Sequence, residues 1–355
     1  MKRIVLYDID GKIPNLALMK ISSFYKKSGY GSILSRCITY IKADIYFAST
    51  IFHNEKSLKC VKTLLDMYGS DICIGGSGIN LQKKLLDETD RCFPDYELYN
   101  HNSYSIGFLT RGCNNYCSFC LVPKKEGKLN SNYASFDDFV PERQKKVMLL
   151  DNSLLASDKS YEILESIIKR NYIINFSQSL DISYLNEDTF NLLIKIKSMN
   201  SRFTKPMYYF TSNTVNQAKI FYKKEWYLKK FERGTVTVII MFGYNTKLSE
   251  DYEILLMTRK LGLFPFVQEY APIPGVPSKI PEDYFDMDLD KIAAIRFRTN
   301  GQNNEKFLRY VNKLHFKTYG KYYLPLLKAI YRYNNKKGIN KYLEQPHLLS
   351  DKQYY

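Results

Sequence analysis

The stretch RGCNNYCSFC, residues 111–120, sets three cysteines at the spacing C-x3-C-x2-C. These are Cys113, Cys117 and Cys120, and no cysteine follows them in the remaining chain. A structural zinc or iron–sulfur site normally has four protein ligands, whereas a catalytic centre keeps one position open. A fourth ligand here would have to be Cys92 or His101, and both lie outside the motif. The spacing therefore predicts a cluster with one iron open for chemistry.

The segments that flank this motif alternate between apolar runs and helical patterns. Apolar runs of strand length occupy residues 105–110, 146–151, 173–178, 207–211, 236–241 and 263–268. Helical patterns lie between them, at residues 160–170, 187–199, 215–231 and 249–261. Six strand–helix units predict a partial (β/α)6 TIM-type barrel. The cysteines directly follow its first strand, at the mouth where such barrels place their chemistry.

The residues before the motif predict a separate α/β domain. Strand-like runs at residues 3–9, 44–49 and 71–74 alternate with helical patterns at 14–27 and 59–67. This pattern predicts a doubly wound, Rossmann-like sheet, with the turn GGSG (residues 75–78) at the end of a strand, where ligands usually bind. A basic helical region follows the barrel. We therefore expect domains at residues 1–100, 101–290 and 291–355.

The cysteine loop also resembles a known family. CNNYCSFC, with Phe119 just before the last cysteine, is similar to the cluster-binding loop of the radical S-adenosylmethionine superfamily. Other segments resemble the group in that superfamily that carries an N-terminal cobalamin-binding-like domain. They are PNLALMKIS (14–22), GGSG (75–78), LVPKKEG (121–127), LLDNSLLAS (149–157) and NFSQSLDI (175–182).

The resemblance implies a cofactor set and a reaction. Cys113, Cys117 and Cys120 would hold a [4Fe–4S] cluster whose open iron binds S-adenosylmethionine. One electron from the reduced cluster would split this cofactor into methionine and a 5′-deoxyadenosyl radical, which the protein aims at its substrate. An electron donor such as ferredoxin or flavodoxin is implied as well. Reactions in the superfamily range from methyl transfer to sulfur insertion, so the substrate stays open among RNA, a peptide and a metabolite.

The resemblance further implies cofactor contacts at the ends of the barrel strands. The backbone around Phe119 would approach the adenine, and polar side chains would contact the amino acid and ribose portions: Asp151, Asn152, Ser177, Gln178 and Asp181. The candidate mouth is completed by Thr211, Phe242, Gly243 and Gln268. The residues alone leave other roles open. Asn152 could cap a helix, and Gln178 and Asp181 could form turns.

One departure from the family concerns cobalamin. Domains of this kind often carry an Asp-x-His-x-x-Gly loop after the first strand, but this chain has YDIDGKIPN, residues 7–15, without histidine. The domain either binds cobalamin without a histidine ligand or keeps the fold without the cofactor, and we expect the second. Methylthiotransferases instead use three cysteines there for a second cluster. Cys37, Cys60 and Cys73 lack that wide spacing, so we expect them to be buried small apolar residues.

Composition bounds the partners and the location. The 355 residues are 45% hydrophobic, which is typical of a globular chain. Their formal charge of +16 suits either a polyanionic partner or simply a lysine-rich surface, and on charge alone we favour the second. The chain has seven cysteines, an odd number, and its apolar runs are too short to cross a bilayer, so we expect a cytoplasmic protein without membrane contact.

The charge is concentrated near the C-terminus. Residues 306–343 hold ten Lys or Arg, no Asp or Glu, and nine Phe or Tyr. On a helix, one face would collect Arg309, Lys313, Lys317 and Lys321. This basic face either contacts nucleic acid or is simply exposed to solvent, while the apolar residues of the helix pack on the barrel. We favour the second alternative.

Two functions follow from these features. The first is a radical S-adenosylmethionine enzyme. The alternative is a nucleic-acid-binding protein whose three cysteines hold a structural zinc or iron–sulfur site. The missing fourth ligand and the six strand–helix units favour the enzyme.

Overall fold

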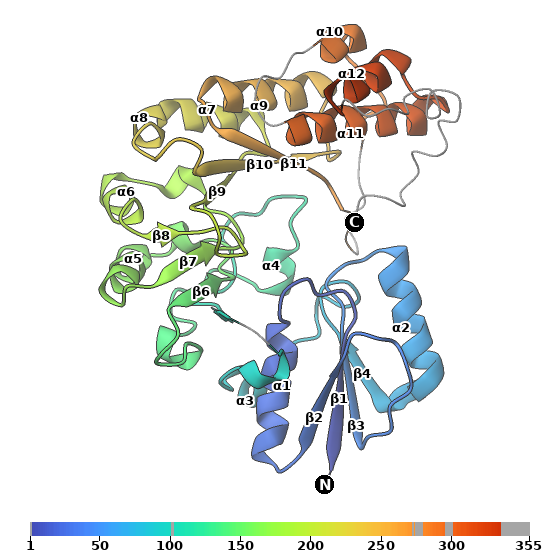
Figure 1. Ribbon diagram of the computed structural model, residues 1–355, viewed down its shortest axis with the longest axis vertical. Helices are drawn as coiled ribbons and strands as arrows, with labels where there is room; N and C mark the ends of the chain where they lie inside the picture. Colours follow the sequence, from blue (N-terminus) through green and yellow to red (C-terminus); the bar gives the residue numbers. More distant parts are fainter. Residues whose placement is uncertain (1, 101–102, 272, 274–279, 295–300, 335–355) are drawn as a thin grey trace. The chain divides into compact units, whose positions relative to one another are not determined.

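We describe the chain from a computed structural model that covers residues 2–100, 103–271, 273, 280–294 and 301–334 (Figure 1). The described residues form two compact units. The first draws on residues 1–211, 220–237 and 271–278, and the second on residues 212–219, 238–270 and 279–355. These units do not coincide with the three expected domains, whose boundaries stay a prediction. Within the described ranges, no helix has the length and apolar character needed to span a membrane.

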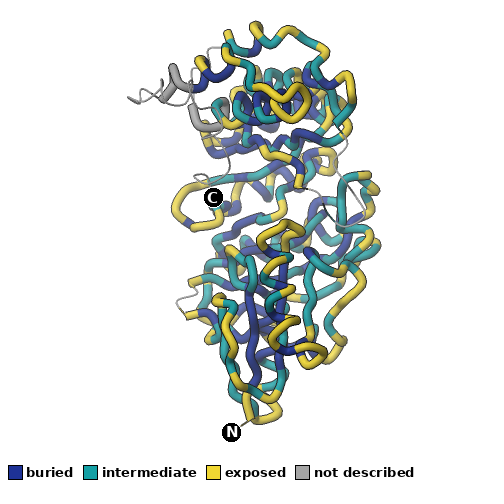
Figure 2. Tube along the Cα trace, turned by 90° about the vertical axis from the view of Figure 1, so that its right-hand side faces the viewer, coloured by how far each residue is buried: buried dark blue, intermediate teal, exposed yellow. Residues whose placement is uncertain are grey.

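The first unit begins with a parallel sheet in the order β2-β1-β3-β4. Its strands are β1 (Arg3–Asp8), β2 (Gly31–Ser35), β3 (Ile45–Ser49) and β4 (Ile72–Gly75). On one face Leu6 packs with α1 (Leu16–Lys27), and on the other Val5 packs with α2 (Glu55–Tyr68). Because helices cover both faces, β1 is buried from Ile4 onward (Figure 2), and its residues 4–7 form one apolar run before the buried Asp8.

Local signals explain where these elements begin. Asn15 and Asn54 precede α1 and α2, and their side-chain oxygens accept backbone N–H bonds from Leu18 and Ser57. Strand β2 was not among the expected elements. Its GSILS stretch is only half-buried along the edge of the sheet, and it begins with glycine, so it lacks the apolar run that marks the other strands.

A second parallel sheet of the first unit has the order β5-β6-β7-β8. Its strands are β5 (Ser105–Gly107), β6 (Lys146–Leu149), β7 (Ile173–Phe176) and β8 (Lys197–Ser198). The connections carry α5 (Ser160–Lys169) and α6 (Glu187–Leu193). The helix expected at residues 187–199 ends early, because β8 follows it. Two parallel sheets with intervening helices confirm the predicted α/β class.

The remaining strands form a sheet in the order β9-β10-β11, with β9 (Tyr208–Thr211), β10 (Val236–Phe242) and β11 (Phe264–Glu269). The expected strands therefore all exist, while their closure into a partial barrel stays a prediction. The later helices are α7 (Val215–Lys223), α8 (Glu225–Leu228), α9 (Leu248–Lys260), α10 (Leu289–Ala294), α11 (Gly301–Tyr319) and α12 (Leu324–Asn334).

Two four-residue helices matter for the site, α3 (Asp87–Asp90) and α4 (Val122–Lys125). Single turns of 3-10 helix occupy Gly69–Asp71, Tyr96–Leu98, Phe136–Asp138, Leu154–Ala156 and Ile182–Tyr184. The turn at Ile182–Tyr184 follows β7, so it lies at the carboxyl end of the second sheet.

Candidate functional site

The three cysteines lie in residues 111–130, a loop after β5 that includes α4 and whose two ends meet. Arg111 and Asn130 exchange backbone hydrogen bonds of 3.0 and 2.8 Å, and the N–H of Cys113 donates to the carbonyl of Gly127 at 3.2 Å. Gly112 makes this closure possible. Its φ is +92°, and a Cβ there would overlap the carbonyl oxygen of Lys128.

Backbone donors approach two of the sulfurs. The N–H of Asn115 donates to the Sγ of Cys113 at 3.3 Å, and the N–H of Val122 donates to the Sγ of Cys120 at 3.4 Å. Such bonds stabilise thiolate ligands and tune iron–sulfur clusters. Cys113 is buried, and Cys117 and Cys120 are half-buried. The donor set and its shielding therefore fit a cluster held by three thiolates.

The thiols are near one another, but they are not gathered as they would be around a bound metal. Among the described residues, no three Cys, His, Asp or Glu side chains converge into a metal-binding group. Burial raises the pKa of Cys117, and the charges of Cys120 and Cys113 raise it further. Burial also raises the pKa of Cys120. Without metal these thiols are protonated at neutral pH, so metal binding must release their protons.

Of the two outside candidates for a fourth ligand, the structure describes Cys92, whose thiol is hydrogen-bonded away from the loop. Cys92 is buried in the first unit, where its Sγ approaches the carbonyl of Glu88 at 3.3 Å. His101 lies outside the described residues.

Asp151 holds the start of the loop. It follows β6, is buried, and accepts hydrogen bonds from the backbone N–H of Leu109 at 3.1 Å and from the hydroxyl of Thr110 at 2.8 Å. Burial raises the pKa of Asp151 to about 6, although the bonds from Thr110 oppose the shift. Its carboxylate is already hydrogen-bonded to other residues of the protein. The expected contact of Asp151 with a cofactor stays a prediction.

Asp181 ties the cysteine loop to the segment after β7. One carboxylate oxygen accepts the N–H of Ser183 at 2.9 Å, as expected of a turn former, and the other accepts the side-chain amide of Asn115 at 3.1 Å. The hydroxyl of Tyr184 donates to the Oδ1 of the same asparagine at 2.9 Å. Asn115 stands between two of the cysteines, so this triad fixes the loop beside its sulfurs.

The other expected contacts lie near strand ends, except for Phe119, which lies in the cysteine loop. Phe119, Asn152, Ser177 and Thr211 are half-buried, and Gln178 is exposed. Ser179 has a positive φ of 62° and hydrogen-bonds to the hydroxyl of Thr211. Gly243 is buried with a φ of +83°, and Gln268 is exposed, and both belong to the second unit. Their cofactor contacts stay predictions.

Sequence reasoning missed Asn115, Tyr184 and Ser179. Asn115 lies inside the quoted motif, but its partner Asp181 is 66 positions away, so no local pattern pairs them. Ser179 could be recognised only from the backbone, where its φ of 62° lies in the left-handed region. A serine with such a φ is uncommon and marks a constrained segment.

The carboxyl edge of the first sheet is closed by Asp10. Its carboxylate accepts from the hydroxyls of Thr50 at 2.6 Å and Ser57 at 2.7 Å, and from the N–H of Ile51 at 2.7 Å and of Phe52 at 3.1 Å. The adjoining loops touch directly, because a Cβ at Gly76 or Gly78 would overlap the carbonyl of Thr50 or Phe52. This edge does not fit cobalamin, and we assign that cofactor no role.

The expectation for the early cysteines was wrong in part. Cys37 and Cys73 are exposed, and Cys60 is half-buried. Cys37 follows β2 in a loop, and Cys73 lies on β4, an edge strand, so neither position is enclosed. All seven cysteines of the chain are free thiols.

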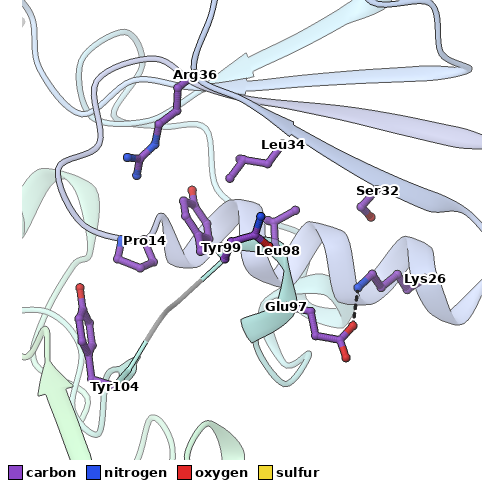
Figure 3. A pocket seen from close by; sticks show the side chains of 10 residues that line it. Pro14, Lys26, Ser32, Leu34, Arg36, Glu97, Leu98, Tyr99 and Tyr104 are labelled. Carbon is purple, nitrogen blue, oxygen red and sulfur yellow. Dashed lines mark hydrogen bonds and ion pairs between the residues drawn. The ribbon is translucent and has the colours of Figure 1, made fainter.

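A cavity of about 640 Å³ opens beside β2 and α1 (Figure 3). Its charged residues are already paired: Lys26 with Glu97 at 3.2 Å, and Arg36 with Asp8 at 3.3 Å. Neither the cysteines nor the expected cofactor contacts line it. We assign it no ligand.

The described part of the basic C-terminal region is partly neutralised. Arg309 pairs with Glu305 at 2.6 Å, and Lys313 and Lys317 lie 3.2 and 3.9 Å from Glu269. The opposite side of α11 is buried, with Phe307, Val311 and Leu314 at most 1% exposed. This arrangement agrees with the favoured alternative, a helix with a solvated basic face and a packed apolar face. Residues 335–343 of the region lie outside the described residues.

Comparison with known proteins gives related sequences. No family model matches the chain. It is 21% identical over 262 residues to a tRNA-2-methylthio-N(6)-dimethylallyladenosine synthase of Bacteroides thetaiotaomicron, covering 65% of this chain and 57% of that protein. The enzyme of that name from Hydrogenobaculum is 23% identical over 323 residues, covering 84% and 71%. A ribosomal protein uS12 methylthiotransferase RimO of Dictyoglomus thermophilum is 23% identical over 230 residues, covering 56% and 52%.

The chain spans less than two thirds of the length of the first of these relatives. The relatives agree with the resemblance drawn from the cysteine loop, and the parallel α/β sheets fit the same superfamily. The chain is therefore similar in sequence to methylthiotransferases, and this similarity fits the radical S-adenosylmethionine superfamily.

Proposed function

We propose that this protein is a radical S-adenosylmethionine enzyme that modifies a macromolecule. The observation that carries the proposal is the loop with three cysteines, closed at its base by Gly112 and provided with backbone donors to two sulfurs. The related methylthiotransferases support it independently.

We assign the cluster to Cys113, Cys117 and Cys120. When bound, the cluster supplies the electron that cleaves S-adenosylmethionine to methionine and a 5′-deoxyadenosyl radical. The chain's own residues shape this site. Asp151 and Asp181 fix the loop from the second sheet, and backbone N–H groups support two of the sulfurs. We propose that Phe119 and the strand-end residues Asn152, Ser177, Gln178, Thr211, Gly243 and Gln268 shield and orient the bound cofactor.

We further propose RNA as the substrate class. Several relatives are named for a tRNA product and one for a ribosomal protein. A formal charge of +16 favours a polyanion through release of counterions. We also propose a partial barrel over residues 101–290, a cytoplasmic location in keeping with seven free thiols, and reduction by ferredoxin or flavodoxin.

The first test is cofactor cleavage. The protein is reconstituted with iron and sulfide without oxygen, dithionite and S-adenosylmethionine are added, and 5′-deoxyadenosine is measured by mass spectrometry. We expect product from the native chain and none from Cys117→Ala. Cys37→Ala is the matched control, because this exposed thiol lies outside the loop, and it should keep full activity.

The substrate is tested by adding total tRNA or total ribosomal protein to the same reaction. The proposal predicts a mass change in tRNA alone, which weakens steeply as salt rises. A protein that retains zinc, forms no cluster and yields no 5′-deoxyadenosine with either substrate would instead be the nucleic-acid-binding protein.

A further inference from the structure

The two ends of the cysteine loop are joined by an ion pair. Arg111 stands two residues before Cys113, and Glu126 stands six residues after Cys120. The Nε of Arg111 donates to the Oε2 of Glu126. The two side chains are only 24% and 8% exposed. Water therefore screens this pair poorly, and each charge depends on the other.

Arg111 uses a different nitrogen to reach residues 2–100, the part of the first unit that holds the first sheet and is called here the N-terminal sheet domain. Its Nη1 donates to the Oδ2 of Asp90, in α3, at 2.8 Å and to the hydroxyl of Tyr133 at 2.6 Å. Tyr133 in turn donates to the same oxygen of Asp90 at 2.7 Å. The guanidinium also lies over the rings of Phe108 and Tyr133, at 5.2 and 5.0 Å. A planar fork with several donors suits this position, and a lysine could not make the same contacts.

Two lysines extend this network, Lys20 in α1 and Lys125 near the second end of the loop. The ammonium of Lys20 lies 3.0 Å from the Oδ1 of Asp90. At the other end, the ammonium of Lys125 donates to the hydroxyl of Ser77, in the loop after β4, at 2.7 Å. It also lies 3.6 Å from Glu126. Both ends of the cysteine loop are thus bonded to segments from the first hundred residues.

We propose that Arg111 is a positioning residue for the cluster and that the N-terminal sheet domain acts as the support of the cysteine loop. Asp90 and Ser77 are the two points of attachment. This role rests on the proposed function, since a cluster is what the loop would hold. It gives the N-terminal domain a task that needs no cofactor of its own, in keeping with the edge that Asp10 closes.

The proposal is tested first without metal, by hydrogen exchange of residues 112–128. In Arg111→Gln, the buried Glu126 loses its hydrogen-bonded partner and keeps only the more distant Lys125, and we expect these amides to exchange about tenfold faster than in the native chain. Arg111→Lys should recover part of the protection. Asp90→Asn should also speed exchange in the loop, although Asp90 lies outside it. Arg170→Gln is the matched control, because this residue makes a two-bond pair with the exposed Asp137 in the same unit.

The second measurement is retention of iron after reconstitution, when a chelator is added. We expect the cluster of Arg111→Gln to bleach several times faster than that of Arg170→Gln. Equal exchange and equal bleaching in these two variants would overturn the proposal. If Arg111→Gln does not fold, Asp90→Asn and Ser77→Ala make the same comparison. If the native chain holds no cluster, the proposed function fails, while the exchange data still decide whether Arg111 positions the loop.

Discussion

Replacing Gly112 by alanine tests whether the base of the cysteine loop is as tight as the structure indicates. At a φ of +92°, an L-residue with a side chain pays about 1–2 kcal/mol for its backbone conformation. The added Cβ would also lie 2.8 Å from the carbonyl oxygen of Gly127 and closer still to that of Lys128. Both contacts are with backbone, so no side chain can swing away, and the hairpin must open.

Opening the base breaks three hydrogen bonds, those between Arg111 and Asn130 and the one from Cys113 to Gly127. At about 1 kcal/mol each, the total for Gly112→Ala is about 4–5 kcal/mol. Gly127→Ala is the matched control. Its φ is +82°, but a Cβ there meets nothing within 4 Å, so it should cost only the backbone term of about 1–2 kcal/mol.

Urea unfolding followed by circular dichroism would give the free energy of unfolding of each variant, and iron analysis after reconstitution would give the occupancy of the loop. We expect Gly112→Ala to be less stable than Gly127→Ala by about 3 kcal/mol and to retain much less iron. Equal free energies of unfolding and equal iron content would refute the proposed tightness of the base.

Two further predictions concern other parts of the chain. Burial raises the pKa of Asp251, which is bonded to the hydroxyl of Tyr284 at 2.9 Å, from 3.8 to about 7. Its contribution to stability is therefore present below pH 4 and lost as the pH rises through 7. Urea unfolding at pH 4 and 7 should show a loss on the order of 4 kcal/mol that is missing in Asp251→Asn, and identical pH profiles would contradict this. Asn115→Ala removes the links to Asp181 and Tyr184 and should lower iron retention more than Tyr184→Phe, which removes one; equal retention in both variants and the native chain would exclude a role for this triad.

The fold was readable from the sequence where apolar runs are strong. β10 was expected at residues 236–241, and it ends one residue later, at Phe242. Its position was readable because six of its seven residues are apolar. β2 was not readable, because its half-buried edge position needs few apolar residues. The burial expected for Cys73 was wrong for the same reason. Its exposure depends on the position of β4 at the edge of the sheet, and the local sequence does not encode the order of the strands.

The candidate site shows a similar division. The cysteine spacing is local, so the motif alone indicated the loop and its chemistry. The groups that hold this loop come from distant segments: Asp90 is 21 positions from Arg111, and Asp181 is 66 positions from Asn115. The family resemblance implied a cofactor contact for Asp151, which stays a prediction, whereas the hydrogen bonds of its carboxylate to Leu109 and Thr110 were not readable because these residues are 42 and 41 positions away.

The closed edge of the first sheet limits how residue 10 can change during evolution. All four groups around the Asp10 carboxylate act as donors, and they come from two stretches of chain, residues 50–52 and Ser57 in α2, which Asp10 joins to its own stretch. Asparagine would turn an NH₂ toward groups that also donate, and alanine would remove the acceptor from the hydroxyls of the buried Thr50 and Ser57. Each accessible substitution would loosen the three stretches together. Position 10 should therefore tolerate almost no drift, whereas the exposed cysteines at positions 37 and 73 should vary freely among close relatives.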